Sequence, residues 1–303
     1  MSSMLVVGSV AFDTLHNARG SFPRVIGGSA TYASLAGSFF TEVQLVGVVG
    51  KDFPDDLVQT MRGRGIDCDG LEVADGPTFH WEGRYTDDLT SRTSLKTELG
   101  VFADFDPKIP EKFRSTPFVM LGNIAPELQI AVLDQVKSPK LVVADTMNFW
   151  IDGARPALEK LLKRVDVLVI NEEEARQLTG KHHMIQVAAK LLEMGPKTAV
   201  IKQGEYGAWL FAGQHVFNAP AFLLEAVDPT GAGDSFAGGF LGYVARAGNL
   251  EPETLKQAVI YGSAVASFCV EGIAVDRLLT LTREEIVNRV HDFRKLVDFQ
   301  IGH

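Results

Sequence analysis

The stretch VDVLVINEEEARQLTG, residues 165–180, holds the pattern that decides the fold class. An apolar, β-branched run ends at Asn171, and consecutive glutamates then open a segment typical of a helix. Glutamates are favoured at a helix start by the helix dipole whether or not they take part in chemistry. A buried strand that leads directly into a helix is the repeating unit of a parallel sheet covered on both faces.

The same alternation recurs along the chain. Further apolar runs lie at residues 4–10, 43–50, 117–124, 140–146 and 197–207, and helix-length patterns lie at 55–65, 126–136, 154–164 and 184–195. The sequence therefore predicts one doubly wound α/β domain over residues 1–303.

Residues 76–104 interrupt this alternation of strands and helices. Polar and apolar residues alternate on both sides of the turn-like DDLTS, which predicts a β-hairpin. The pattern alone leaves open whether the hairpin is a surface decoration, a lid or a dimer clasp.

Composition excludes several classes of function. The chain has 303 residues, 46% of them hydrophobic, and a formal charge of −9, which fits a globular protein and argues against nucleic-acid or membrane-surface partners. Cys68 and Cys269 form no metal or disulfide motif, so we expect a cytoplasmic protein. The N-terminus predicts a strand rather than a signal peptide, and no segment is long and apolar enough to span a membrane.

The candidate site lies where polar residues follow the predicted strands, because ligands of such sheets bind beyond the carboxyl ends of the strands. The residues in these positions are Asp13, Asn123, Asp145, Asn171, Glu174, Lys202 and Gly204. Asn171 and Glu174, three residues apart, could organise water around Mg²⁺, although the helix dipole favours glutamates at a helix start without any metal. The glycine pair Gly27 and Gly28 before a small-residue helix is either a ligand loop or a packing turn.

The segment DPTGAGDSFAGGF, residues 228–240, is the most specific motif. Gly231, Ala232 and Gly233 leave small residues whose amides can point at an anion, and Asp234 follows in the first helical turn. A transient phosphoryl group could be held by the amides while the carboxylate accepts a proton from the attacking hydroxyl. We expect the helix N-terminus to lower the pKa of Asp234 and keep it ionised.

Together these segments resemble the PfkB or ribokinase family of carbohydrate and nucleoside kinases. The resemblance rests on VVGSVAFD, the glycine pair, GVVGKDFP, NEEEA, IKQGEYG and DPTGAGDSFAGGFL. It implies a three-layer α/β sandwich with a small β-sheet lid, contributed here by about residues 12–24 and 76–104. It also implies ATP and Mg²⁺ as cofactors and a hydroxymethyl group of a sugar or sugar-like alcohol as the phosphoryl acceptor.

Site residues carried over by this resemblance fall into several groups. Asp234 becomes the general base, with Gly231, Ala232 and Gly233 as the anion hole. The resemblance implies that the acceptor contacts Asp13, Gly27, Gly28, Ser29, Tyr32 and Asn123. It implies that the nucleotide contacts Asn171, Lys202, Gly204, Gly207, Thr230, Ser263 and Ser267. Glu174 would bind Mg²⁺ through water, and Asp228 and Thr230 correspond to the residues that bind a monovalent cation, K⁺, in those members that have one.

The sequence departs from the family at the acceptor. Tyr32 stands where the family commonly has an asparagine that contacts the sugar. Together with Phe79, Trp81 and Tyr85 it could stack on a base, which keeps a nucleoside acceptor open. A catalytically silent binding protein of the same fold and a homodimer formed through the lid also stay open.

Overall fold

The computed structural model describes residues 2–298, and residues 1 and 299–303 of the predicted domain lie outside the described residues. Its main feature is a nine-stranded sheet in the order β13-β12-β11-β10-β9-β8-β1-β4-β5. The strands are β1 (Ser3–Val7), β4 (Glu42–Gly50), β5 (Ile66–Ala74), β8 (Phe118–Leu121), β9 (Leu141–Asp145), β10 (Val167–Asn171), β11 (Thr198–Lys202), β12 (Ala208–Ala212) and β13 (His215–Ala219). Pairing is parallel from β5 to β11, whereas β12 and β13 at one edge run antiparallel.

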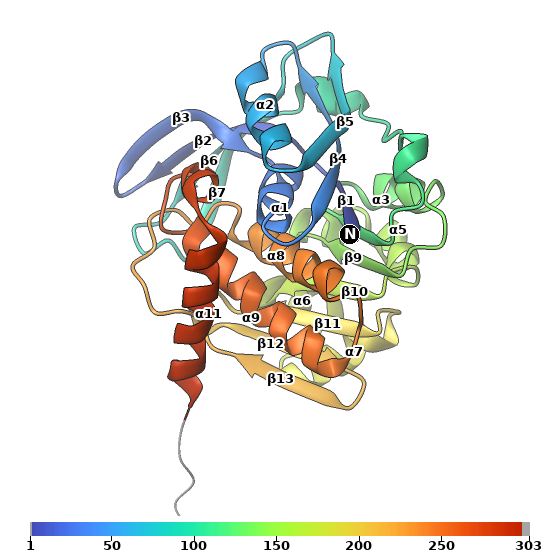
Figure 1. Ribbon diagram of the computed structural model, residues 1–303, viewed down its shortest axis with the longest axis vertical. Coiled ribbons are helices and arrows are strands. Elements are labelled where there is room, and N and C mark those ends of the chain that lie inside the picture. Colours follow the sequence, from blue (N-terminus) through green and yellow to red (C-terminus); the bar gives the residue numbers. More distant parts are fainter. Residues whose placement is uncertain (1, 299–303) are drawn as a thin grey trace, which may run out of the picture.

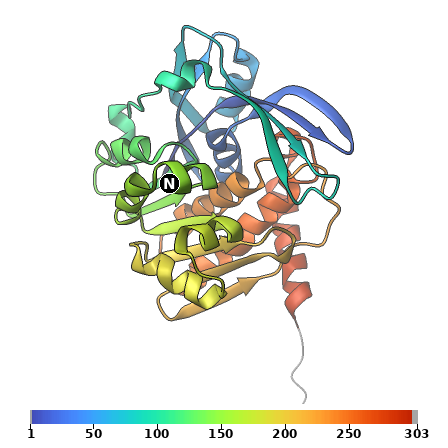
Figure 2. The ribbon, with the colours of Figure 1, turned by 180° about the vertical axis from the view of Figure 1, so that it is seen from behind.

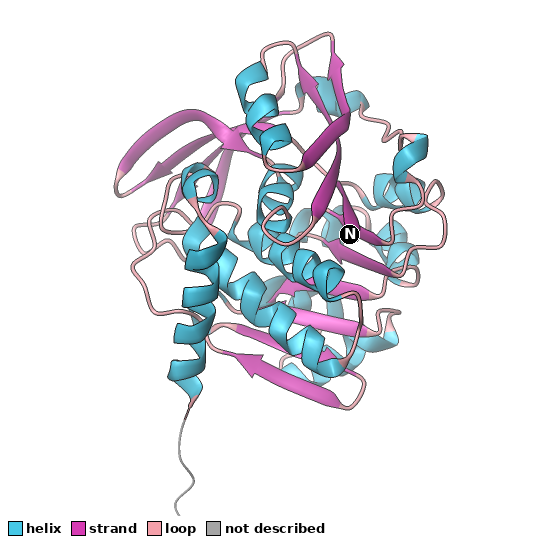
Figure 3. Ribbon diagram, viewed as in Figure 1, coloured by secondary structure: helices cyan, strands magenta, loops and turns pink. Residues whose placement is uncertain are grey.

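Helices cover both faces of this sheet, which gives three layers (Figures 1 and 3). One face packs against α1 (Ser29–Gly37), α2 (Asp55–Gly63), α8 (Ala232–Ala247), α9 (Pro252–Cys269), α10 (Asp276–Thr280) and α11 (Arg283–Val297). The other face, turned to the viewer in Figure 2, packs against α3 (Pro126–Leu133), α4 (Asn148–Gly153), α5 (Arg155–Leu162), α6 (Glu172–Thr179) and α7 (Met184–Glu193).

The side chains of each inner strand alternate between two hydrophobic cores, one on each face of the sheet. In β1, Met4 and Val6 join the core under α1 and α8, whereas Leu5 and Val7 join the core under α3 and α5. Successive side chains of a strand point to opposite faces, so a strand buried on both sides must be apolar throughout. The predicted α/β fold, including every predicted strand and helix named above, is confirmed.

A second, four-stranded sheet projects from one side of the body (Figure 1). Its order is β3-β2-β6-β7, built from β2 (Ala11–Asn17), β3 (Gly20–Gly27), β6 (Phe79–Tyr85) and β7 (Arg92–Glu98). The predicted hairpin is confirmed, because β6 and β7 pair antiparallel around the loop at 86–91. Between residues 2 and 298, no helix has the length and apolarity required to cross a membrane.

Candidate active site

The carboxyl ends of neighbouring strands bring the predicted polar residues together. Asp145 ends β9, and the last residues of β10 and β11, Asn171 and Lys202, are register partners. The Nζ atom of Lys202 lies 3.8 Å from Oδ1 of Asp145. Since parallel strands end at one edge, this side of the sheet collects the charged groups as expected.

The DPTGAGD segment forms the loop that leads into α8. The Asp228 carboxylate accepts hydrogen bonds from the backbone N–H groups of Thr230 and Ala274, each at 2.9 Å, which fixes the loop. Gly231 adopts a left-handed conformation, φ 73°, immediately before the helix begins at Ala232. A left-handed residue at this place favours glycine.

The amides of the predicted anion hole lie at the start of α8. The N–H of Ala232 donates to the Pro229 carbonyl at 3.2 Å, so this amide already has a partner. Amides in the first turn of a helix have no intrahelical acceptor and serve as anion donors. A Cβ built on Gly233 would lie 2.7 Å from the Lys202 Nζ atom, so the lysine occupies the space that the glycine leaves. The loop and the lysine thus form one cationic cradle.

Carboxylates surround this cradle, and their charges interact. Burial, followed by repulsion from Asp145, raises the pKa of Asp234 to about 7. Burial likewise raises the pKa of Asp145, while Lys202 opposes the rise. The expectation that the helix N-terminus keeps the pKa of Asp234 low is wrong, because burial and a second carboxylate outweigh the helix dipole. A pKa near 7 suits a general base better than an ordinary aspartate does.

Asn171 and Glu174 form a capping box at the start of α6. The Asn171 side chain accepts from the Glu174 N–H at 2.8 Å, and the Glu174 carboxylate accepts from the Asn171 N–H at 3.2 Å. Glu174 is also buried beside the site, where burial and the Asp145 charge raise its pKa to about 7. The capping box gives both residues a structural role that the sequence did not indicate, and the Glu174 side chain still lies near the Asp145 carboxylate.

A divalent cation fits this arrangement of oxygen donors. Oδ1 of Asp145 is buried with no hydrogen-bond partner in the described part of the chain, which is costly for a carboxylate. Among residues 2–298, no group of three His, Cys, Asp or Glu side chains is placed to hold a metal by itself. Mg²⁺, which usually keeps several waters and shares them with phosphates, is suited to such a site.

On the other side of the loop, Asp13 projects from β2. A Cβ on Gly27 would overlap the Asp13 carboxylate, so the glycine makes room for it. Burial, then the charges of Asp228 and Asp234, raise the pKa of Asp13 to about 7. The carbonyl of Gly28 accepts from the N–H groups of Thr31 and Tyr32 in α1.

Two of the residues predicted to bind the acceptor, Ser29 and Asn123, have polar partners within the protein, and a third, Tyr32, is packed inside it. The Ser29 hydroxyl and amide pair reciprocally with Ser9, which pins α1 to the loop after β1. Asn123 accepts from the Trp150 indole at 2.9 Å. Tyr32 is 1% exposed, and its ring fills the space beside Gly231 that a Cβ there would need. Stacking of Tyr32 on a ligand is therefore contradicted, and the ring supports the anion loop instead.

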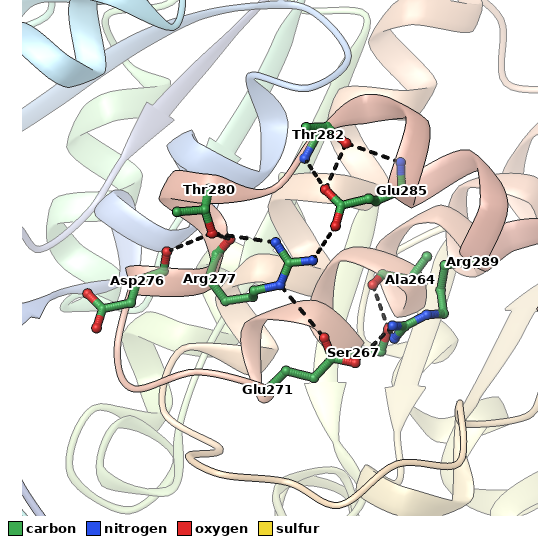
Figure 4. A network of polar contacts seen from close by, with 9 residues as sticks. All are labelled: Ala264, Ser267, Glu271, Asp276, Arg277, Thr280, Thr282, Glu285 and Arg289. Atoms are coloured by element: carbon green, nitrogen blue, oxygen red, sulfur yellow. Dashed lines mark hydrogen bonds and ion pairs between the residues drawn. The ribbon is translucent and has the colours of Figure 1, made fainter.

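The predicted nucleotide neighbours on α9 are partly engaged. Ser263 is half-buried, whereas the Ser267 hydroxyl accepts from Arg289 at 2.8 Å. As Figure 4 shows, Arg289 belongs to a network with Glu271, Arg277 and Glu285 that joins α9 to α11. Ser267 thus has a structural role. Gly204 begins an exposed turn after β11, and Gly207 makes room for the Ala219 carbonyl.

Sequence reasoning assigned no role to two charged residues of the site. Asp145 was recognised only as a strand-end carboxylate. Arg92, on β7 of the small sheet, interacts electrostatically with Asp145, Glu174 and Asp234. Its position in a polar hairpin carries no signal that distinguishes it from a surface arginine.

Comparison with known proteins agrees with this geometry. Residues 1–278 match the pfkB family of carbohydrate kinases. The chain is also 32% identical over 260 residues to the cytidine kinase of Thermococcus kodakarensis, covering 83% of this chain and 91% of that protein. The chain belongs to the pfkB family. This pfkB protein is an ATP-dependent kinase whose acceptor is a sugar or a nucleoside.

Other relatives of the pfkB protein include the nucleoside kinase of Methanothermobacter thermautotrophicus, 27% identical with 88% and 89% of the two chains covered. Among solved structures, the ribokinase of Thermotoga maritima superposes with a TM-score of 0.76 at 22% identity, over 96% of this chain and 100% of that one. The nucleoside kinase of Burkholderia thailandensis in complex with inosine gives 0.78 at 17% identity, over 97% of each chain. At these identities the structures establish the ribokinase fold alone.

Proposed function

We propose that this protein transfers the γ-phosphoryl group of ATP to the hydroxymethyl group of a nucleoside, with Asp234 as general base. The observation that carries the chemistry is the position of Asp234 in the first turn of α8, beside the Gly231–Gly233 amides and opposite Lys202. Phosphoryl transfer needs positioned donors for the moving charge and a group that receives the hydroxyl proton. This arrangement supplies both.

In the proposed step, the acceptor hydroxyl attacks the γ-phosphorus as the bond to the ADP oxygen breaks. Asp234 takes the hydroxyl proton, and its raised pKa makes it an adequate base near neutral pH. The amides of Gly231 and Gly233, with the Lys202 ammonium, stabilise the charge on the phosphoryl oxygens. Asp13 orients the acceptor by accepting a hydrogen bond from a sugar hydroxyl.

Mg²⁺ would be held through water by Glu174 and Asp145, and it would neutralise charge on the nucleotide phosphates. Asn171, Thr230, Gly204, Gly207 and Ser263 border the nucleotide in this proposal. Whether K⁺ binds near Asp228 is testable by replacing it with Na⁺ in the assay.

A nucleoside is favoured over a free sugar by two observations. The Thermococcus kodakarensis relative named cytidine kinase aligns over most of both chains. In addition, the small sheet turns the half-buried Trp81 to the same side as Asp13, because the two are register partners on adjacent strands and such partners share a face. An aromatic ring next to the aspartate proposed to bind the sugar suits a base. A small sugar is the second candidate, and the small sheet acts as the lid for either.

A panel of nucleosides and sugars, each with ATP and Mg²⁺ and followed by ADP release, tests this proposal. We expect the highest kcat/KM with a pyrimidine or purine nucleoside and strict dependence on Asp234. Replacing Asp234→Asn should lower kcat by about 10²–10⁴ with little change in KM. A loss of less than about tenfold rules out the general-base role, and absence of acceptor-dependent ADP release across the panel rules out the kinase function.

A further inference from the structure

The small sheet brings a positive charge toward the anion loop. Arg92 on β7 is the register partner of Tyr85 on β6, so both side chains project from the same face. The Arg92 guanidinium lies 5.6 Å from the centre of the Trp81 ring, and it lies beside the Tyr85 hydroxyl. That hydroxyl is 3.0 Å from the hydroxyl of Thr230, the residue before Gly231. Arg92 therefore lies beside Tyr85, which in turn contacts Thr230, the residue that precedes the anion loop.

Arg92 interacts electrostatically with carboxylates on both the acceptor side and the nucleotide side of the proposed site. It favours the ionised form of Asp13 on the acceptor side, and of Asp145, Glu174 and Asp234 on the nucleotide side. Within residues 2–298, however, no carboxylate forms an ion pair with Arg92. Its side chain is exposed.

An arginine without a carboxylate partner in the described residues, directed at a cluster of charges, is suited to bind an anion from solution. Its planar fork matches the oxygens of a phosphoryl group. Arg92 lies beside the Tyr85 hydroxyl, and that hydroxyl contacts Thr230, the residue before Gly231 of the anion loop. These contacts favour the phosphoryl group over a charged substituent of the acceptor as the anion that Arg92 meets.

We propose that Arg92 is a catalytic residue that contacts the phosphoryl group in transit, an inference that rests on the proposed kinase function. In this step the bond between the γ-phosphorus and the ADP oxygen breaks, a bond to the acceptor oxygen forms, and the hydroxyl proton passes to Asp234. Lys202 and the loop amides stabilise the equatorial oxygens from the body of the protein. Arg92 stabilises them from the small sheet, so that closure of this sheet completes the site.

Steady-state kinetics of three variants test this inference. Arg92→Ala should lower kcat at saturating ATP and acceptor by about 10²–10³-fold while the acceptor KM changes less than about threefold. Arg92→Lys, which keeps the charge but loses the fork, should recover part of that loss. The matched control is Arg84→Ala, because Arg84 precedes Tyr85 on β6 and therefore points away from the body. Its kcat should equal that of the unchanged protein.

Added guanidinium provides a readout that a structural role would not give. It should restore part of the kcat of Arg92→Ala and leave Arg84→Ala unaffected. A kcat of Arg92→Ala within about threefold of the unchanged protein overturns the inference, as does a large rise in acceptor KM at constant kcat, which would place the acceptor against Arg92. If the unchanged protein phosphorylates no acceptor, the proposed function itself fails. If it does and Arg92→Ala matches it, only the role of Arg92 fails.

Discussion

Replacing Asp13→Asn should stabilise the ligand-free protein at pH 8 and leave its stability unchanged near pH 4. Asp13 is 5% exposed, and its pKa is raised from 3.8 to about 7, chiefly by burial and then by the Asp228 and Asp234 charges. Between these two values the unfolded chain releases a proton that the folded protein retains. Stability therefore falls as the pH rises from about 4 to about 7.

The size of this effect follows from the same two pKa values. A rise from 3.8 to about 7 corresponds to about 4 kcal/mol of unfavourable free energy once the carboxylate is ionised. The neutral amide of asparagine avoids this cost, although it loses the carboxylate's favourable interaction with Arg92. We expect a gain of about 2–4 kcal/mol in the free energy of unfolding at pH 8.

Urea denaturation followed by circular dichroism, without nucleotide or Mg²⁺, measures the difference at pH 4.5, 6, 7 and 8. Asp87→Asn, the same chemical change in the exposed hairpin loop, is the matched control. A gain for Asp13→Asn that does not vary with pH, or a loss of stability at pH 8, would refute the assignment of Asp13 as a buried, repelled carboxylate. The same variant should bind acceptor weakly, because stability and function oppose each other at such a residue.

Two further predictions concern the proposed base, Asp234, and Gly27, the residue that makes room for the Asp13 carboxylate. Since Asp234 must lose its proton to act and its pKa is about 7 in the ligand-free protein, kcat/KM should rise with pH across neutrality; a flat profile from pH 6 to 8 would contradict this. Gly27→Ala should displace the Asp13 carboxylate and so raise the acceptor KM at least about tenfold. It should also lower the free energy of unfolding by about 1–3 kcal/mol, because the added Cβ overpacks the site. Gly63→Ala on α2, where a Cβ meets open space, is its control, and an unchanged acceptor KM for Gly27→Ala would show that Asp13 does not orient the acceptor.

Much of the fold could be predicted from the sequence because the inner strands of the central sheet, such as β1, β9 and β10, are apolar on both faces. The runs at 140–146 and 165–171 need no partner to be recognised, since burial on both sides leaves no polar alternation. The edge strand β13 carries no comparable signal, because it is largely exposed. A strand at a solvent-exposed edge has the composition of a loop.

The site was predictable only where local sequence determines local structure. The glycines of residues 231–233 and the first-turn position of Asp234 follow from the order of residues along one loop. The pKa of Asp234 does not, because Asp145 comes from another strand and the helix dipole is a weaker influence than burial. Tyr32 was misassigned for the same reason: its ring packs beside Gly231, far away in the chain.

Charge balance explains why distant residues dominate this site. Asp13, Asp145, Glu174 and Asp234 surround a loop whose ligand would be an anion, and on its own such a cluster repels phosphate. The pKa values of Asp13, Glu174 and Asp234, each raised to about 7, let the ligand-free protein reduce this repulsion by retaining protons near neutral pH. A nucleotide that arrives with its cation supplies positive charge to the same carboxylates and so favours their ionised forms. The carboxylate beside the anion loop therefore becomes a base when the phosphoryl group is present to be transferred.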